Sequence, residues 1–115
     1  MEKSIDEKEK NLVSIVIPTY NTGPFIKKTI QSILNQTYEN WELIIIDNHS
    51  KDDTVKNILN FEDKRIKLFK IFNKGVIGLS RNIGIKKATG KWIAFLDADD
   101  WWYSDKLERT ISKLE

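Results

Sequence analysis

The sequence has no cysteine, a single histidine and only two prolines among its 115 residues. Without cysteine the fold has no disulfide and no thiolate metal ligand, which is typical of a protein kept in a reducing cytosol. No apolar run approaches the roughly 20 residues that cross a bilayer, and the N-terminus lacks the apolar core of a secretory signal. Neither a membrane span nor a secretion signal is therefore expected in this sequence.

An excess of charge of one sign is also missing. Lysines and arginines number 19 and aspartates and glutamates 17, which gives a net charge of +2. Such a balance provides no general attraction to nucleic acid or to an anionic membrane surface. No nucleic-acid partner is predicted.

The residues that are present predict one globular domain. Hydrophobic residues make up 40% of the chain and charged residues 31%, and a chain of this length closes a single core. Residues 1–10, MEKSIDEKEK, mix both charge signs with one isoleucine and are interpreted as a solvated N-terminal arm. The domain is expected over residues 11–115.

Four strands are expected where short β-branched or alternating runs end at polar residues or proline. They cover residues 12–18, 41–47, 65–72 and 91–96. The fourth, KWIAFL, is apolar enough to be covered on both faces, as central strands of parallel sheets are.

Helical periodicity follows each strand. Pro24 suits a first helical position, and Ser50 with Asp53 has the spacing of a capping box for a second helix. A third helix is expected to be closed by Gly90, and a fourth to run from Ser104 to the last residue. The apolar residues expected to face the core recur at helical spacing: Ile26, Ile30, Ile33, Leu34, Val55, Ile58, Leu59, Leu79, Ile83, Leu107, Ile111 and Leu114.

Strict alternation of strand and helix predicts an α/β fold: an open, mostly parallel sheet with helices on both faces, in a Rossmann-like arrangement. Ligands of such sheets bind beyond the carboxyl ends of the strands. Three polar clusters follow strands in this sequence: PTYN at 18–21, DNHS at 47–50 and DADD at 97–100. Each alone is more typical of strand ends and helix caps, but all three are expected on one rim.

The last cluster places Asp97, Asp99 and Asp100 within four positions. Carboxylates converging on one rim repel one another unless a cation or hydrogen-bond donors neutralise them, which favours a divalent metal. Hard oxygen ligands suit Mg²⁺ or Mn²⁺, and Mg²⁺ is typically held by one or two carboxylates together with substrate phosphates. The cluster therefore predicts a phosphorylated ligand.

With these motifs, the sequence resembles the nucleotide-sugar-binding half of family 2 glycosyltransferases of the GT-A fold. The resemblance covers Leu12 to the end and consists of five segments in that family's order: VSIVIPTYN, FIKKTIQSILNQT, ELIIIDNHSKDDT, NKGVIGLSRNIGIKKATGKW and FLDADD. It implies transfer of a sugar from a nucleotide diphosphate sugar, with UDP the commonest nucleotide and Mn or Mg as cofactor. It also implies a saccharide or glycoconjugate acceptor.

The resemblance assigns the donor pocket as follows. Pro18, Thr19 and Tyr20 are expected to line the base and ribose pocket, and Asp47 is expected to contact the base.

The resemblance also assigns the metal and phosphate residues. Asp97 is expected to face the ribose or sugar, and Asp99 to bind the metal, with Asp97 and Asp100 as further candidate ligands. Arg81, with Asn82 beside it, is expected near the donor phosphates or sugar.

Family members continue into an acceptor-binding half that supplies the general base for inverting transfer. This sequence stops at Glu115, after the acidic D-x-D motif, so we expect the donor-binding half alone and assign no catalytic base. Without the second half, apolar surface on the sheet is expected to favour self-association. Polysaccharide or glycoconjugate assembly at the cytoplasmic face of the membrane is the setting that the resemblance implies.

Other aromatic and glycine residues have two interpretations each. Trp101 and Trp102 are candidates for stacking on a sugar face, although packing is the commoner fate of tryptophan. Gly75, Gly78 and Gly84 serve turns or permit close backbone approach to a ligand.

Two alternative functions stay open. One is a noncatalytic module that binds a sugar nucleotide. The other is a phosphohydrolase with an aspartate nucleophile in the D-x-D motif, which is disfavoured because the motif ends the fourth strand and Trp101 follows. His49 stands where the family usually has glycine and is interpreted as structural or peripheral, in a turn that tolerates its positive φ.

Overall fold

The computed structural model describes residues 11–72 and 77–114, so the predicted arm at 1–10 and Gly75 lie outside the described residues. The predicted alternation of strands and helices is confirmed. The elements, in chain order, are β1 Val13–Thr19, α2 Gly23–Leu34, β2 Trp41–Asn48, α3 Thr54–Leu59, β3 Ile66–Ile71, α4 Ile77–Lys87, β4 Trp92–Phe95 and α5 Lys106–Leu114.

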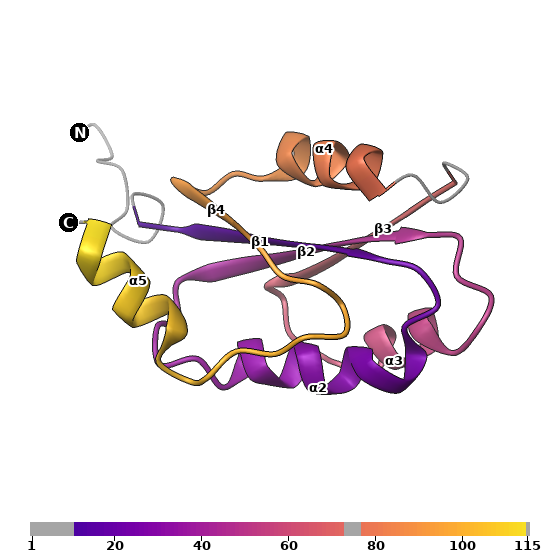
Figure 1. The fold of residues 1–115 in the computed structure, drawn as a ribbon, viewed down its shortest axis with the longest axis horizontal. Coiled ribbons are helices and arrows are strands. Elements are labelled where there is room, and N and C mark those ends of the chain that lie inside the picture. Colours follow the sequence, from indigo (N-terminus) through magenta and orange to yellow (C-terminus); the bar gives the residue numbers. More distant parts are fainter. Residues whose placement is uncertain (1–10, 73–76, 115) are drawn as a thin grey trace, which may run out of the picture.

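The strands form one parallel sheet in the order β3-β2-β1-β4. Figure 1 shows α4 over one face of this sheet and α2 and α3 over the other, with α5 on the side of α2. The predicted open α/β fold with helices on both faces is therefore confirmed. Because β1 pairs on both of its edges, the carboxyl ends of β2, β1 and β4 meet side by side.

Burial follows the position of each strand in the sheet. β2 is buried throughout and β1 nearly so, because each pairs with two strands and lies between helices. The prediction that the fourth strand is covered on both faces is wrong. β4 pairs only with β1 among the described residues, and its Ile93 and Phe95 are 40% and 44% exposed.

The apolar periodicity located the main helical core face correctly. Ile26, Ile30 and Ile33 of α2 are fully buried, and they join one cluster with residues of β1, β2, α3, β4 and α5. Leu59 and Leu114 were expected inside but are exposed, because α3 has one turn and a half and both residues lie at the last position of their helices.

Three further details of the helices differ from prediction. Leu79, near the start of α4, is 49% exposed rather than buried. α4 ends at Lys87, before Gly90, whose N–H instead donates to Ser14 Oγ at 2.8 Å. α5 begins at Lys106, two residues after the predicted Ser104.

The predicted capping box of α3 is also wrong. Asp53 is the N-cap residue but makes no side-chain capping bond. Its neighbour Asp52 accepts the N–H of Thr54 at 2.9 Å instead. The hydrogen bond from the Thr54 hydroxyl outweighs the opposite effect of burial and holds the pKa of Asp52 below its usual range. Ser50 does not cap α3, because its N–H and its hydroxyl both donate to the Asp47 carboxylate.

Gly84 brings α4 close to the sheet. A Cβ added to Gly84 would lie 2.3 Å from Cγ1 of the buried Val16 in β1. The absence of a side chain at this position therefore serves helix–sheet packing rather than approach to a ligand.

Replacement of the two glycines of α4 separates packing from helix propensity. Gly84→Ala is expected to lower the free energy of unfolding by about 1–3 kcal/mol, since α4 must shift away from Val16. Gly78→Ala is the matched control on the same helix, because nothing lies within 4 Å of its added Cβ; it is expected to change stability by less than about 1 kcal/mol. Urea unfolding measures both, and equal effects would contradict the packing role.

A buried carboxylate ties the amino ends of the strands together. Glu42 of β2 is 4% exposed, and its Oε2 accepts hydrogen bonds from Ser14 Oγ at 2.5 Å and from N and Oγ1 of Thr89 at 2.7 and 2.9 Å. Lys67 Nζ donates to Oε1 at 2.8 Å. Burial raises the pKa of Glu42, but the bonds from Lys67, Ser14 and Thr89 outweigh it and lower the pKa to about 2.

The depressed pKa of Glu42 predicts how stability depends on pH. Ionised Glu42 stabilises the folded state fully above its unfolded pKa, near 4.5, and the contribution is lost as pH falls through about 2. Glu42→Gln is expected to lower the unfolding free energy at pH 7 by about 2–3 kcal/mol, with a smaller loss at pH 3. Urea unfolding between pH 2.5 and 7 tests this, with the exposed Glu62→Gln as control; equal behaviour of the two variants would contradict it.

Candidate functional site

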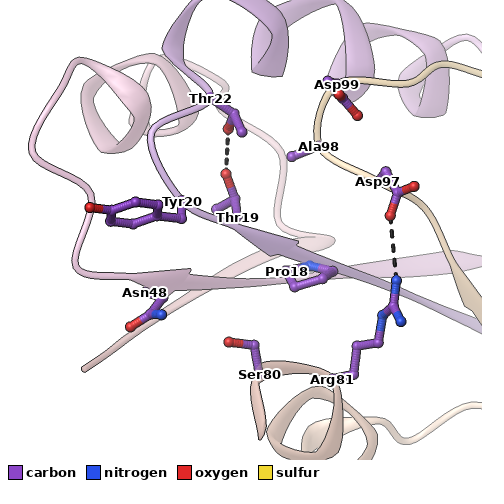
Figure 2. A pocket seen from close by; sticks show the side chains of 10 residues that line it. All are labelled: Pro18, Thr19, Tyr20, Thr22, Asn48, Ser80, Arg81, Asp97, Ala98 and Asp99. Atoms are coloured by element: carbon purple, nitrogen blue, oxygen red, sulfur yellow. Dashed lines mark hydrogen bonds and ion pairs between the residues drawn. The ribbon is translucent and has the colours of Figure 1, made fainter. Parts of the chain in front are cut away.

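A cavity of about 420 Å³ lies beyond the carboxyl ends of β1, β2 and β4 (Figure 2). α4 closes it on the side opposite the loop that follows β4. Its lining residues are Pro18, Thr19, Tyr20, Thr22, Asn48, Ser80, Arg81, Asp97, Ala98 and Asp99. The cavity thus brings together six of the predicted site residues: Pro18, Thr19, Tyr20, Arg81, Asp97 and Asp99.

The end of β1 forms the floor of the cavity. Thr19 is buried, and its hydroxyl is hydrogen-bonded to that of Thr22, whereas Tyr20 is 51% exposed. Asn21 has a φ of 50° and turns the chain toward α2. Its N–H donates to Ser50 Oγ at 2.9 Å, so the loops after β1 and β2 support each other.

Asp47 does not line this cavity. It is 1% exposed, and its two oxygens accept the N–H of Ser50 at 3.0 Å and the Ser50 hydroxyl at 2.5 Å. Together with His49, Lys70 and Phe72 it lines a neighbouring hollow. Successive strand residues point to opposite faces, so the next residue, Asn48, is the one that reaches the cavity.

His49 occupies the turn after β2 in a left-handed conformation, with a φ of 56°. Its ring packs against Phe72 with 5.1 Å between the ring centroids. The turn therefore persists with histidine in place of glycine.

The acidic loop after β4 separates its three carboxylates. Asp97 Oδ1 lies 3.5 Å from Arg81 Nη2, and the Asp99 side chain lines the cavity next to it (Figure 2). Ala98 between them is 5% exposed and packs in the main core. Asp100 is not among the lining residues, and its carboxylate accepts the N–H of Trp101 at 2.8 Å.

α4 contributes a cation opposite the acidic loop. The Arg81 guanidinium faces Asp97 and lies 5.8 Å from the ring centroid of Phe95, and it is the one basic group among the described lining residues. Asn82 is exposed and is not among them.

The two tryptophans after the acidic loop differ in their surroundings. Trp102 is partly buried against the main core. Trp101 is 41% exposed, with Lys28 Nζ 4.8 Å from its ring centroid and Tyr103 packed edge-on at 5.1 Å. Sugar stacking on Trp101 stays a prediction.

Four lining residues were missed by sequence reasoning: Thr22, Asn48, Ser80 and Ala98. Asn48 stands inside the DNHS cluster, so strand alternation was the signal available for it. Thr22 directly follows the PTYN cluster. For Ser80 no local signal exists, since the placement of α4 over the sheet decides which of its residues face the cavity.

The cavity residues fit a divalent cation that also binds phosphate. In residues 11–72 and 77–114, no group of three or more acidic, histidine or cysteine side chains is placed to hold a metal by itself. Asp97 and Asp99 nevertheless both line the cavity and offer hard oxygens to it, and Mg²⁺ commonly takes one or two carboxylates with substrate phosphates and water. The donor set therefore suits an ion whose coordination is completed by a diphosphate.

A parallel α/β sheet with an acidic and basic cavity beyond its carboxyl edge is typical of the class of open α/β domains that bind ligands at the ends of their strands. Within that class, the chain belongs to glycosyl transferase family 2, whose sequence pattern matches residues 14–115. No helix in the described part of the chain is long and apolar enough to cross a membrane.

Two named relatives illustrate the family. The chain is 48% identical over 104 residues to the Escherichia coli UDP-Glc:alpha-D-GlcNAc-diphosphoundecaprenol beta-1,3-glucosyltransferase WfgD. It is 38% identical over 104 residues to the putative teichuronic acid biosynthesis glycosyltransferase TuaG of Bacillus subtilis. The matches cover 90% and 89% of this chain but 41% of each relative, so the chain spans about two fifths of their length.

Solved structures share the fold. S. aureus TarS 1-349 in complex with UDP superposes with a TM-score of 0.82 at 27% identity, over 87% of this chain and 31% of that one. The mannosyltransferase PcManGT from Pyrobaculum calidifontis, in complex with GDP-Man and Mn²⁺, gives a TM-score of 0.84 at 25% identity, over 91% of this chain and 32% of that one.

The place of Arg81 predicts a role in anion binding. Arg81→Gln removes the cation that faces the cavity and is expected to weaken binding of UDP with Mn²⁺ by about tenfold, the effect of one lost charged hydrogen bond. Arg109→Gln is the control, because Arg109 of α5 forms an exposed ion pair at 3.8 Å with Asp105, the residue before that helix. Calorimetric titration measures both, and equal affinities in the two variants would contradict the role.

Proposed function

We propose that this chain is the donor-binding part of a glycosyltransferase that uses a nucleotide diphosphate sugar, with UDP as the favoured nucleotide. One observation carries the proposal: a single cavity joins Asp97, Asp99 and Arg81 to the end of β1. Family membership supports it, as do a relative named for UDP-Glc and a similar fold in complex with UDP-GlcNAc.

The proposed donor contacts involve residues that line the cavity and two neighbours that do not line it, Asp47 and Asn82. Pro18, Thr19 and Tyr20 contact the base and ribose, and Asp47 contacts the base from the neighbouring hollow. Asn82 stands near the phosphates from the exposed side of α4. These contacts hold the donor so that its diphosphate meets the charged side of the cavity.

The chemistry at the diphosphate follows from its charge. As the bond between the anomeric carbon and the diphosphate oxygen breaks, negative charge gathers on the leaving group. Asp99, with Asp97 beside it and Asp100 as a further candidate, would hold Mn²⁺ or Mg²⁺, which supplies Lewis-acid stabilisation of that charge. Arg81 adds a second positive charge from α4.

We propose sugar transfer as the activity of the whole protein, and donor binding as the part that this chain contributes. Inversion at the anomeric carbon requires a general base that takes the proton of the acceptor hydroxyl, and we assign none among the described residues.

The acceptor is proposed to be a saccharide or glycoconjugate carried on a lipid, because the E. coli relative is named for an undecaprenol-linked sugar. The cytoplasmic face of the membrane is the proposed location of the reaction. Self-association through the exposed side of β4 is a further proposal, which sedimentation of the chain tests.

Titration of UDP into the purified chain, with and without Mn²⁺, tests the donor site. Binding is expected to depend on Mn²⁺ and to weaken by roughly tenfold or more in Asp99→Asn, equivalent to at least about 1.4 kcal/mol. Asp53→Asn serves as the control, because Asp53 is an exposed aspartate with no side-chain capping bond, and it is expected to bind like the unmodified chain.

Two outcomes would count against the proposal. A folded chain that binds neither UDP nor another nucleoside diphosphate in the presence of Mn²⁺ would contradict a donor site. Binding that is unaffected by Asp99→Asn would remove the acidic loop from that site. Acceptor-dependent turnover by the whole protein separates a transferase from a module that only binds the donor.

A further inference from the structure

Three buried polar side chains project from α2 and from the second residue after its end. Thr29, Ser32 and Gln36 are 1%, 9% and 4% exposed. Thr29 and Ser32 are three residues apart, which places them on one side of α2. Gln36 follows four residues later, beyond the end of the helix. Polar groups buried in this way require partners, because each unpaired group costs free energy.

Partners for all three lie after β4, in the segment that leads to α5 and in the first turn of α5. This segment runs along α2 in Figure 1. Ser32 Oγ accepts the N–H of Trp102 at 3.2 Å. Gln36 Nε2 donates to the Tyr103 carbonyl at 2.7 Å, and Gln36 Oε1 accepts the N–H of Leu107 at 3.0 Å. These bonds connect groups that are 67 to 71 residues apart in the chain. Two of them pair backbone groups in a segment that has no strand or helix of its own, and the third pairs the N–H of Leu107 in the first turn of α5.

Thr29 contacts the acidic loop itself. Its Oγ1 lies 2.9 Å from the carbonyl oxygen of Ala98 and 2.5 Å from that of Asp100, so one hydroxyl proton is shared between acceptors on either side of Asp99. The Ala98 side chain is buried in the main core. The backbone around Asp99 is therefore held by the packing of Ala98, by the Thr29 hydroxyl and by the hydrogen bond from the Asp100 N–H to the Asp97 carbonyl at 3.0 Å. The Asp99 carboxylate stays exposed toward the cavity.

We propose that Thr29 is a positioning residue for the donor site. Its hydroxyl fixes the backbone on both sides of Asp99 and so determines where that carboxylate stands relative to Asp97 and Arg81. The inference rests on the proposed function, since it concerns the carboxylate that is proposed to bind the metal. Thr29 acts through Asp99 and touches neither the nucleotide nor the ion.

Thr29→Val tests the inference because it keeps the shape of the side chain and removes the hydroxyl. Two measurements are made: hydrogen exchange of the backbone amides of residues 99–103 in the ligand-free chain, and titration of UDP with Mn²⁺. Both exchange rate and dissociation constant are expected to rise about five- to tenfold, the factor for one lost buried hydrogen bond. Thr29→Ser keeps a hydroxyl and is expected to restore both within about twofold.

Thr110→Val is the matched control. Thr110 Oγ1 donates to the carbonyl of Lys106 four residues earlier at 2.8 Å, as Thr29 does weakly to that of Phe25 at 3.3 Å, but Thr110 lies on the exposed side of α5. It is expected to change neither measurement. If Thr29→Val does not fold, the smaller Thr29→Ala removes the same hydroxyl and is measured instead.

The outcomes separate this inference from the proposed function. Unchanged exchange in the folded Thr29 variant would overturn the inference, whether or not UDP binds. Faster exchange with unchanged UDP affinity, when Asp99→Asn does weaken binding, would also overturn it, because the loop would then be anchored without consequence for Asp99. If UDP does not bind to the unmodified chain, the proposed function fails, and the positioning role fails with it even where exchange confirms the anchor.

Discussion

The parallel pairing of β1 with β2 on one edge and β4 on the other is the constraint on which the rest of the structure depends. It aligns three strand ends at one rim, so short loops after each strand meet although they are far apart in the chain. It also leaves β1 buried, because helices cover both faces where the sheet is widest. The cavity forms where α4 and the acidic loop extend past this rim, so the position of the site follows from strand order more than from any single residue.

The carboxylate of Glu42 and those of the acidic loop after β4 differ in their surroundings. At the amino ends of the strands, Glu42 is buried and accepts hydrogen bonds from three neighbouring residues. Its negative charge therefore stabilises the contacts between the strands. At the carboxyl ends, Asp97 and Asp99 are exposed, and the partner found for Asp97 is a long ion pair with Arg81. An exposed pair of this kind contributes little to stability. These groups are therefore available to a ligand at small cost to the fold.

Sequence patterns predicted much of the fold because its core elements are strongly periodic. Ile26, Ile30 and Ile33 fall on one face of α2 by spacing alone. The errors occur where local pattern and tertiary position disagree. KWIAFL is as apolar as a central strand, yet β4 lies at an edge. Ser50 has capping-box spacing, yet Asp47 is a nearer partner for its hydroxyl.

The sequence by itself determined the alternation of strands and helices, and with it which polar clusters end strands. These properties are local, because the periodicity of apolar residues and the end of a strand depend on residues that are neighbours in the sequence. Only the tertiary structure decided that Asn48 rather than Asp47 lines the cavity and that Arg81 faces Asp97. It alone paired Thr29 with a carbonyl 69 residues along the chain. Such contacts depend on strand order and on the placement of helices over the sheet, which the core as a whole sets.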